Sequence, residues 1–250
     1  MAKFSVIVVA AGKGERFGGK ENKIFAQLDN QPIFIRALQL FVNREDVCQT
    51  ILVVAPEDSE AMKTKFGPNI AFMGVKLVEG GTDRHNSVAN GLAAVSEDAE
   101  YVAIHDAARV CVAAEWIDAV FAEATKSGAA IPVVPVSATL KRVSPAKIIT
   151  ETVPREELYM AQTPQVFRKD IITAAYAALK EQGAALVGGA PITDDAQIVT
   201  AAGHAVSVIE GDSRNIKITT RDDLKLASAV LKALPQKPTA RRGAFEEAQW

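Results

Sequence analysis

Short runs rich in valine and isoleucine alternate with segments of helical spacing, and this alternation limits the possible folds more than any other feature of the chain. The runs cover residues 4–10, 50–55, 101–105, 129–136 and 205–209. Because they are apolar at successive positions, they are typical of strands buried on both faces. Apolar residues at helical spacing cover residues 33–41, 86–95, 115–126 and 169–181. We therefore predict an α/β fold, with a mostly parallel sheet flanked by helices on both sides.

Two segments fall outside this alternation. Residues 137–158 contain lysines, arginines and threonines but little apolar periodicity, so we expect an excursion from the sheet, such as an arm. Prolines at positions 235 and 238 follow the last helical pattern and favour a loose end. A chain of 250 residues can bury a sizeable core. The sequence predicts a single domain over residues 1–234, with an arm at about 137–158 and a flexible tail over 235–250.

The composition indicates which partners and which compartment to expect for the protein. The formal net charge of −2 gives no global attraction to nucleic acid or to an anionic membrane. No segment approaches the roughly 20 apolar residues that span a bilayer, and the apolar run near the N-terminus is short for a signal peptide. Cys48 and Cys111 lie far apart and outside any metal-ligand spacing, which fits a reducing compartment. We expect a cytoplasmic protein with no nucleic-acid or membrane partner.

The strongest chemical signal is the glycine-rich segment over residues 10–19, which follows the first apolar run and holds four glycines. Glycine allows positive φ and close approach of the backbone, so successive N–H groups can converge on phosphate oxygens. The spacing is neither the Walker form nor G-x-G-x-x-G. The segment predicts a triphosphate site, with an ordinary glycine turn and solvated lysines as the alternative. Four cationic residues add to its charge: Lys13, Arg16, Lys20 and Lys23.

A second signal is the pair Asp106 and Arg109, placed directly after a predicted strand. Ligands of parallel sheets bind at the carboxyl ends of the strands. Asp106 could hold Mg²⁺ on nucleotide phosphates, and Arg109 could bind a second anion with its forked donors. A surface salt bridge is the alternative. His105, which precedes them, is expected to be structural.

Two weaker signals complete the candidate site. Gly80 and Gly81 predict a turn into a helix, and the short polar groups around Ser87 could bind the edge of a base. Lys217 could act as a point charge that faces a phosphate.

Taken in order, these pieces belong to six blocks, and the chain resembles the 2-C-methyl-D-erythritol 4-phosphate cytidylyltransferase family of the non-mevalonate isoprenoid pathway over about residues 4–232. The blocks are Ala10-Ala11-Gly12-x-Gly14-x-Arg16, Gly80-Gly81 with Arg84 and Ser87-Val88, His105-Asp106-Ala107-Ala108-Arg109, Gln162-Thr163-Pro164-Gln165, Thr193-Asp194-Asp195-Ala196 and Asn215-Ile216-Lys217-Ile218-Thr219.

The resemblance implies a Rossmann-like nucleotidyltransferase sheet with a protruding β-arm, and a homodimer whose arms interlock. It implies that CTP and 2-C-methyl-D-erythritol 4-phosphate, a polyol phosphate, give 4-diphosphocytidyl-2-C-methyl-D-erythritol and pyrophosphate, with Mg²⁺ as cofactor. By the same resemblance the catalytic residues are Arg16, Lys23, Asp106 and Lys217, with Asp106 near the metal. The nucleotide-binding residues are Ala10, Ala11, Gly12, Gly14, Gly80, Gly81 and Ser87. The acceptor-binding residues are Arg109, Thr139, Arg155, Thr163 and Thr193, of which Arg155 and Thr163 reach the pocket of the partner subunit.

The chain departs from the family pattern at a few positions. Asn22 precedes Lys23 where the family has proline, so Lys20 is a rival for the catalytic charge. Ala138 and Val110 also differ from the family, on the acceptor side. A cytidylyltransferase that uses ribitol 5-phosphate is therefore one alternative, although Ala108 favours the first acceptor. A nucleotide-binding homologue that has lost its chemistry is another, whereas a Rossmann dehydrogenase lacks the required glycine spacing.

Overall fold

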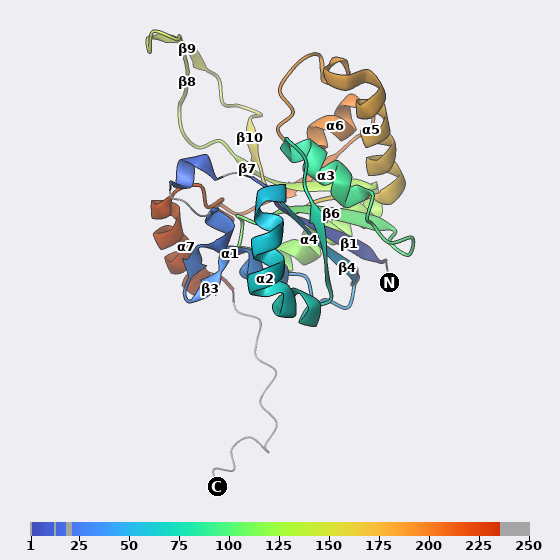
Figure 1. Cartoon of the computed structure of the whole chain (residues 1–250). Coiled ribbons are helices and arrows are strands. Elements are labelled where there is room, and N and C mark those ends of the chain that lie inside the picture. The colour runs from blue at the N-terminus through green and yellow to red at the C-terminus, as the bar shows by residue number, and fades with distance from the viewer. Residues whose placement is uncertain (1, 13, 19–21, 236–250) are drawn as a thin grey trace.

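A computed structural model describes residues 2–12, 14–18 and 22–235 of the chain. In this described part, eight strands form one sheet in the order β10-β7-β11-β6-β1-β4-β5, with β12 beside β7 (Figure 1). The parallel centre consists of β1 (Phe4–Ala10), β4 (Val47–Val54), β5 (Val75–Glu79) and β6 (Tyr101–Asp106). The other sheet strands are β7 (Ala129–Pro135), β10 (Tyr159–Ala161), β11 (Gln165–Arg168) and β12 (Ser207–Glu210). The predicted α/β class with a mostly parallel sheet is confirmed.

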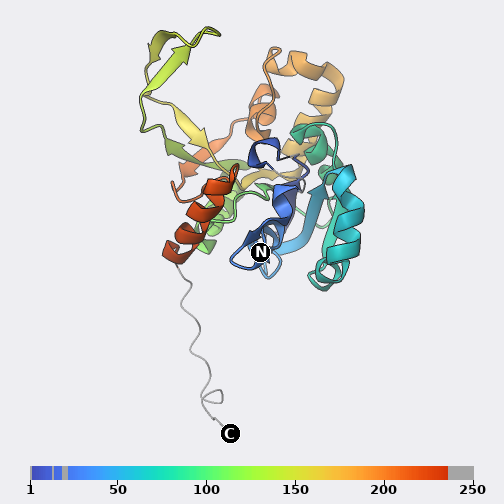
Figure 2. The ribbon, with the colours of Figure 1, turned by 60° about the vertical axis from the view of Figure 1, so that its left-hand side comes forward.

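Helices cover both faces of the sheet, as Figure 2 shows from the side. One face carries α1 (Ile33–Gln39), α2 (Pro56–Phe72), α4 (Ala114–Ser127) and α7 (Arg221–Ala233). The other carries α3 (Arg84–Leu92), α5 (Lys169–Gln182) and α6 (Asp195–Ala201). Side chains alternate along each strand, so Val6 and Val8 of β1 join the first buried cluster and Ile7 joins the second. This double burial explains why β1 is apolar at successive positions.

The four parallel strands at the centre all end at the same edge of the sheet. There β1 leads into the glycine-rich segment with the short helices η1 (Glu15–Phe17) and η2 (Lys23–Phe25). Strand β4 leads into α2, β5 leads into Gly80 and Gly81, and β6 ends at Asp106. Segments that are far apart in sequence therefore meet at this edge, which is where ligands of such sheets bind.

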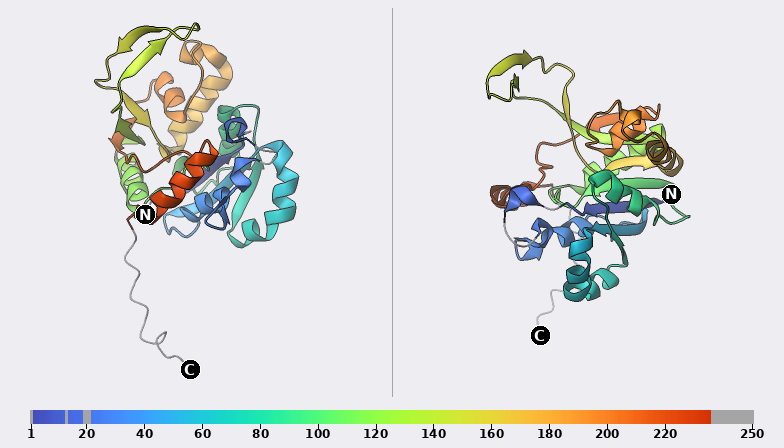
Figure 3. Two further views of the ribbon diagram at one scale, coloured as in Figure 1. Left: turned by 90° about the vertical axis from the view of Figure 1, so that its left-hand side faces the viewer. Right: turned by 45° about the horizontal axis from the view of Figure 1, so that its top comes forward.

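The predicted arm leaves the body of the molecule as a separate two-stranded sheet, formed by β8 (Leu140–Val143) and β9 (Ile149–Val153) (Figures 1 and 3). Apolar side chains are exposed on the arm and at its base, including Val143, Ile149, Tyr159 and Met160. A hairpin with this much exposed apolar surface is typical of a segment that packs against another chain.

The remaining elements are short, namely β2 (Gln27–Leu28), β3 (Gln31–Pro32) and η3 (Gly183–Val187). No helix in the described ranges combines the length and the apolar composition needed to cross a membrane. Apart from its first residue, Pro235, the predicted tail over 235–250 lies outside the described residues.

The packing of α3 on the sheet depends on Gly91. A Cβ atom added there would lie 2.8 Å from Ile7 Cγ2 and 3.2 Å from Val53 Cγ2. We predict that Gly91→Ala lowers the free energy of unfolding by about 1–3 kcal/mol, because the well-packed sheet must shift. Gly67→Ala on α2 is the matched control, since nothing lies within 4 Å of its added Cβ. In the control, the gain in helix propensity is opposed by crowding against Pro68, so a change within about 1 kcal/mol is expected. Equal decreases in the free energy of unfolding for Gly91→Ala and Gly67→Ala, measured with urea, would contradict this account of the packing.

Candidate active site

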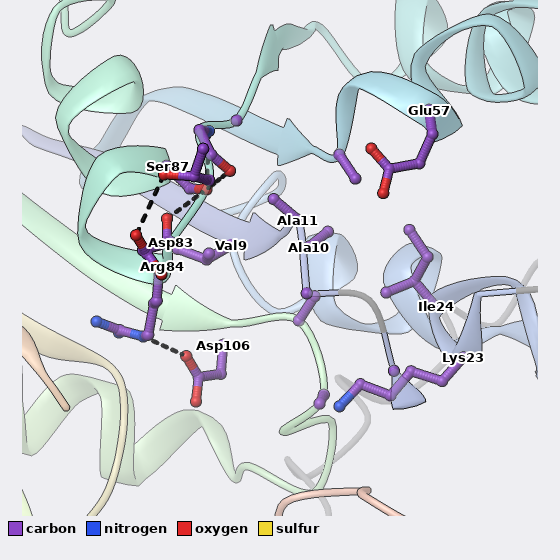
Figure 4. Close-up of a pocket in the computed structure, with 18 of the residues that line it drawn as sticks. Val9, Ala10, Ala11, Lys23, Ile24, Glu57, Asp83, Arg84, Ser87 and Asp106 are labelled. Carbon is purple, nitrogen blue, oxygen red and sulfur yellow. Dashed lines mark hydrogen bonds and ion pairs between the residues drawn. The ribbon is translucent and has the colours of Figure 1, made fainter. Parts of the chain in front are cut away.

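The carboxyl edge of the central strands opens into a pocket of about 980 Å³ (Figure 4). The pocket lies between the glycine-rich segment, the start of α2, the turn after β5 and the end of β6. It brings together most of the residues that the sequence predicts for the nucleotide and for catalysis, whose roles stay predictions here. They are Ala10, Ala11, Gly12, Gly14, Arg16, Lys23, Gly80, Gly81, Ser87, Asp106 and Lys217.

The described residues of the glycine-rich segment are held to the body of the molecule at Gly12, Phe17 and Gly18. Gly14 adopts the left-handed conformation at φ 66°, which favours glycine, and precedes η1. Phe17 on η1 is buried, and the guanidinium of Arg221 lies 5.7 Å from the centre of its ring. The side chain of Arg16 remains exposed at the pocket. Lys13 and Lys20, which the sequence also singles out, lie outside the described residues.

Asp106 is the centre of the charged groups in the pocket. Its Oδ1 accepts a hydrogen bond from Arg84 Nε at 3.2 Å, and its Oδ2 accepts one from Lys217 Nζ at 2.6 Å. Burial alone would raise the pKa of Asp106, but the positive charges of Arg84 and Lys217 outweigh burial and lower it. Asp106 is therefore an anion at neutral pH, and it joins the ends of three segments of the chain.

Arg84 connects this carboxylate to a second one in the core. Its Nη1 donates to Asp195 Oδ2 at 2.8 Å, and Asp195 is fully buried. The Tyr176 hydroxyl donates to Asp195 Oδ1 at 2.7 Å, and the Asp195 amide donates to Gln165 Oε1. Sequence reasoning assigned no role to Arg84 or Asp195. Both residues lie in blocks that carry the family resemblance, so the sequence did mark them. It could not show that their charges pair with each other in the interior.

Lys217 is held by the segment around it. Ile218 is fully buried and its amide donates to Ala108 O at 2.9 Å. The next amide, that of Thr219, donates to Asp223 Oδ2 at 2.8 Å, in the first turn of α7. Asp223 also completes the capping box of α7 with Thr220. The start of α7 therefore fixes the lysine that reaches Asp106.

Lys23 enters the pocket from η2 on the opposite side. Its Nζ donates to Ile218 O at 3.2 Å, which places it beside Lys217. Burial lowers the pKa of Lys23, and the positive charge of Lys217 lowers it further. Lys23, Lys217, Arg84 and Arg16 all line the same pocket as Asp106. Glu57 and Asp83 also line the pocket, so its four described cations face three carboxylates, and the remaining positive charge favours an anionic ligand.

His105 and Thr163 support Asp106 from behind. His105 Nε2 lies 2.8 Å from Arg109 O, and Nδ1 lies 3.0 Å from Thr163 Oγ1. A carbonyl can only accept, so Nε2 carries the proton and Nδ1 accepts from the Thr163 hydroxyl. Thr163 Oγ1 in turn accepts from the Asp106 amide at 3.1 Å. The expectation that His105 is structural agrees with these contacts.

The prediction that Thr163 binds the acceptor in the partner subunit stays a prediction, and in the single chain this residue lies behind Asp106. Thr163 is 4% exposed, and its hydroxyl is committed to His105 and Asp106 of its own chain. The assignment to the acceptor site comes from the family resemblance.

At the other end of the pocket, Gly80 and Gly81 present their backbone because no side chain fits. A Cβ atom at Gly80 would lie 2.6 Å from Ala11 Cβ, and one at Gly81 would lie 2.5 Å from Asn86 Cβ. Ser87 Oγ accepts from the Gly81 amide at 3.1 Å and is 3.0 Å from Asp83 O, to which it donates. Figure 4 shows Ser87 and Asp83 at this end, close to Ala11. This end of the pocket, called the slot below, is lined by Gly80, Gly81, Asp83 and Ser87.

None of the predicted acceptor residues, Thr163 included, lines the pocket of the single chain. Arg109 Nη1 donates to Asn215 O at 2.6 Å, and the Thr193 hydroxyl bonds to Gln197. Thr139 and Arg155 are exposed at the base of the arm, where the Arg155 guanidinium donates to Ser137 O. The chain alone therefore gathers the predicted nucleotide and catalytic residues but leaves the predicted acceptor residues outside.

Comparison with known proteins agrees with this geometry. The profile of the 2-C-methyl-D-erythritol 4-phosphate cytidylyltransferase family matches residues 4–233. The chain is 40% identical over 241 residues to the protein of that name from Rhodopirellula baltica, covering 92% of this chain and 95% of the relative. It is 40% identical over 233 residues to the one from Alkaliphilus oremlandii, covering 93% and 96%. The solved structure of the Francisella tularensis 2-C-methyl-D-erythritol 4-phosphate cytidylyltransferase is also similar, with a TM-score of 0.76 and 28% identity over 92% of this chain and all of that one.

The buried histidine gives the fold a measurable dependence on pH. Burial lowers the pKa of His105 from 6.5 to about 4. Below pH 6.5 the unfolded chain therefore binds a proton at this position that the folded chain does not bind. We predict that stability falls as the pH drops from 6.5 towards 4, by up to about 1.4 kcal/mol per pH unit from this group. His105→Gln is expected to remove that part of the slope in urea unfolding at several pH values.

The partly exposed His204 supplies the matched control. His204→Gln is expected to keep the slope of the parent chain. Carboxyl groups titrate in the same range but are shared by all three proteins, so the difference between slopes isolates His105. Identical slopes for the parent and His105→Gln would show that the buried ring is not responsible.

Proposed function

The chain belongs to the 2-C-methyl-D-erythritol 4-phosphate cytidylyltransferase family, and we propose that its pocket transfers a cytidylyl group from CTP to 2-C-methyl-D-erythritol 4-phosphate. The products are 4-diphosphocytidyl-2-C-methyl-D-erythritol and pyrophosphate. The chain is accordingly a nucleotidyltransferase. The observation that carries the proposal is the meeting of the glycine-rich segment, Lys23 and the pair Asp106 and Lys217 in one pocket.

We assign the triphosphate of CTP to the glycine-rich side of the pocket. Amides near Gly12 and Gly14 can approach phosphate oxygens without a side chain between them. Arg16 and Lys23 line the same side and add positive charge. The base is assigned to the slot at Gly80 and Gly81, where the two glycines line the pocket with backbone groups that can form hydrogen bonds.

The reaction is a substitution at the α-phosphorus of CTP. A phosphate oxygen of the acceptor forms a new bond to this phosphorus, and the bond to the bridging oxygen of the β-phosphate breaks. Pyrophosphate leaves with the bonding electron pair. Charge on the transferred phosphoryl group and on the leaving group is stabilised by fixed cations, which are expected to account for most of the rate. Lys23 and Lys217 are the lysines placed for this role, because both lie beside Ile218 and Asp106.

We also propose that Mg²⁺ acts with the nucleotide and that Asp106 holds it. Within the described residues, no group of three histidine, cysteine or acidic side chains could form a protein-only metal site. Mg²⁺ is commonly held by one or two carboxylates together with phosphate oxygens of the substrate. The ionised Asp106 fits this donor set, because each of its oxygens has a further lone pair beyond its bond to Arg84 or Lys217. When bound, the ion would neutralise phosphate charge.

The arm is proposed to complete the acceptor site in a homodimer with interlocked arms. Its exposed apolar residues, such as Val143 and Ile149, need a covering surface, and a second copy of the chain supplies one. Arg155 lies at the base of this arm and outside the pocket of its own chain. We assign Arg155 to the acceptor site of the partner subunit.

We further propose a cytoplasmic location. Both cysteines of the chain are free, with Cys48 exposed and Cys111 buried. Unpaired thiols are the rule in a reducing compartment.

Turnover with defined acceptors tests the function directly. We expect pyrophosphate release from CTP with 2-C-methyl-D-erythritol 4-phosphate, in the presence of Mg²⁺, and little with ribitol 5-phosphate. Lys23→Ala should lower kcat by about 100-fold or more while CTP binding is largely retained, because the lysine stabilises charge that develops in the transition state. Lys126→Ala, an exposed lysine on α4, is the control and should match the parent.

Each alternative has its own signature in this assay. Turnover with ribitol 5-phosphate alone would assign the other acceptor. CTP binding without turnover on any acceptor would identify a nucleotide-binding protein that has lost its chemistry. Full activity of Lys23→Ala would remove this lysine from the catalytic residues.

Hybrid dimers test the role of the arm. We expect Arg155→Ala and Lys217→Ala to be inactive separately but to complement each other when they are co-expressed with different affinity tags and purified as a hybrid. One pocket of the hybrid then has an intact Lys217 and an intact Arg155 from its partner, so about half of the parent activity should return. An inactive hybrid, or a monomer in sedimentation, would show that Arg155 does not act across subunits.

A further inference from the structure

Asn22, directly before Lys23, connects three parts of the pocket wall. Its Nδ2 donates to Gly12 O at 3.0 Å and to Asp58 Oδ2 at 2.7 Å. Its Oδ1 accepts from the Ile24 amide at 3.3 Å and so caps η2. One side chain therefore links the glycine-rich segment, the short helix that carries Lys23 and the first turn of α2.

The backbone of Lys23 is fixed on its other side as well. Ile24 and Phe25 are buried, and the ring of Phe25 stacks on Phe66 of α2 with centres 5.8 Å apart. The Phe25 amide donates to Asn22 O at 3.0 Å. Lys23 thus lies between a side-chain cap before it and two anchors in the core after it. Loss of the cap would free only the side that faces the glycine-rich segment.

Neither Asn22 nor Asp58 lines the pocket, but both are next to residues that do. Gly12 and Gly14 line the pocket on the side of the glycine-rich segment, and Pro56 and Glu57, directly before Asp58, line it at the start of α2. The bond from Asn22 to Asp58 ties these two sides together. A change at either end of this bond is therefore transmitted to the phosphate side of the pocket.

We propose that Asn22 is a positioning residue for catalysis, whose amide group holds Lys23 and the glycine-rich segment in register with α2. The inference rests on the proposed function, because the catalytic role of Lys23 comes from it. Asn22 touches neither the nucleotide nor the acceptor in this account. It acts through the lysine that follows it.

The backbone of Asn22 offers a rescue variant. Its φ and ψ are −61° and 139°, and Pro32, the N-cap of α1, has almost the same values of −56° and 141°. Proline fixes φ near −65°. It can therefore hold this conformation through its ring, without the hydrogen bonds of the amide. Alanine can do neither.

Kinetics of substituted chains test the proposal. Asn22→Ala is expected to lower kcat at least about 10-fold, with the KM for CTP changed less than about 3-fold, because a small displacement of a catalytic group slows the chemical step. Asn22→Pro should return kcat to within about 3-fold of the parent. Asn69→Ala, an exposed asparagine on α2, is the control and should leave both constants unchanged. A parent-like kcat in Asn22→Ala overturns the proposal, as does failure of proline to recover activity in a folded chain.

A double-mutant cycle tests the link to α2. If the bond to Asp58 carries the effect, Asn22→Ala and Asp58→Ala will be non-additive, and the double variant will be no slower than the slower single variant. Strict additivity of the two changes in kcat would show that the tether does not run through Asp58.

Hydrogen exchange separates this proposal from the proposed function. In the chain without substrates, mass spectrometry of a peptide over residues 22–28 should show faster exchange in Asn22→Ala and near-parent exchange in Asn22→Pro. Both variants remove the side-chain acceptor of the Ile24 amide, but only alanine lets η2 loosen and expose the Phe25 and Ala26 amides, which donate to the carbonyls of residues 22 and 23. If the parent chain has no turnover on any acceptor, the proposed function fails, and hydrogen exchange alone tests whether the Asn22 side chain holds η2 in place. Unchanged exchange in Asn22→Ala would then overturn that positioning role.

Discussion

The charge balance at Asp106 is the constraint on which the rest of the site depends. One buried carboxylate accepts from Arg84 at the start of α3 and from Lys217 in the segment before α7, and it lies at the end of β6. Removing one partner of such a buried pair leaves an uncompensated charge, which costs several kcal/mol. The end of β6, the start of α3 and the segment before α7 must therefore meet at Asp106 when the chain folds. This meeting places Arg84 and Lys217 at the edge of the sheet.

The surroundings of Asp106 differ on its two sides, and the difference produces a binding site. Behind it, a neutral His105 and the Thr163 hydroxyl satisfy the Asp106 amide without adding charge. In front of it, Lys23 and Arg16 line a pocket in which four described cations face three carboxylates, Asp106 included. An anionic ligand would neutralise the positive charge that remains in the pocket. The slot at Gly80 offers backbone groups at the far end, so charge and hydrogen bonding are available to different parts of a nucleotide.

The sequence predicted the fold class and the chemistry of the edge because both depend on local patterns. Buried strands such as β1 are visible as unbroken apolar runs, and a glycine-rich segment after a strand indicates a phosphate site wherever the strand lies. Three features escaped prediction. The strand β5 is short and only partly buried, and α2 contains Gly67 and Pro68, so neither gives a strong periodic signal. The contacts of Arg84, Asp195 and Thr163 depend on which charges and hydrogen-bonding groups meet in the interior, and no spacing in the sequence encodes that.

The central claim is that the cations around Asp106 and the glycine-rich segment surround the phosphates of CTP. A crystal structure with a non-hydrolysable CTP analogue and Mg²⁺ tests it most directly. We expect the triphosphate within hydrogen-bonding distance of the amides near Gly12 and of Lys23 Nζ, with the α-phosphate beside Lys217 and the base in the slot at Gly80. Phosphates bound away from Lys23 and Asp106, or a base outside that slot, would contradict the account.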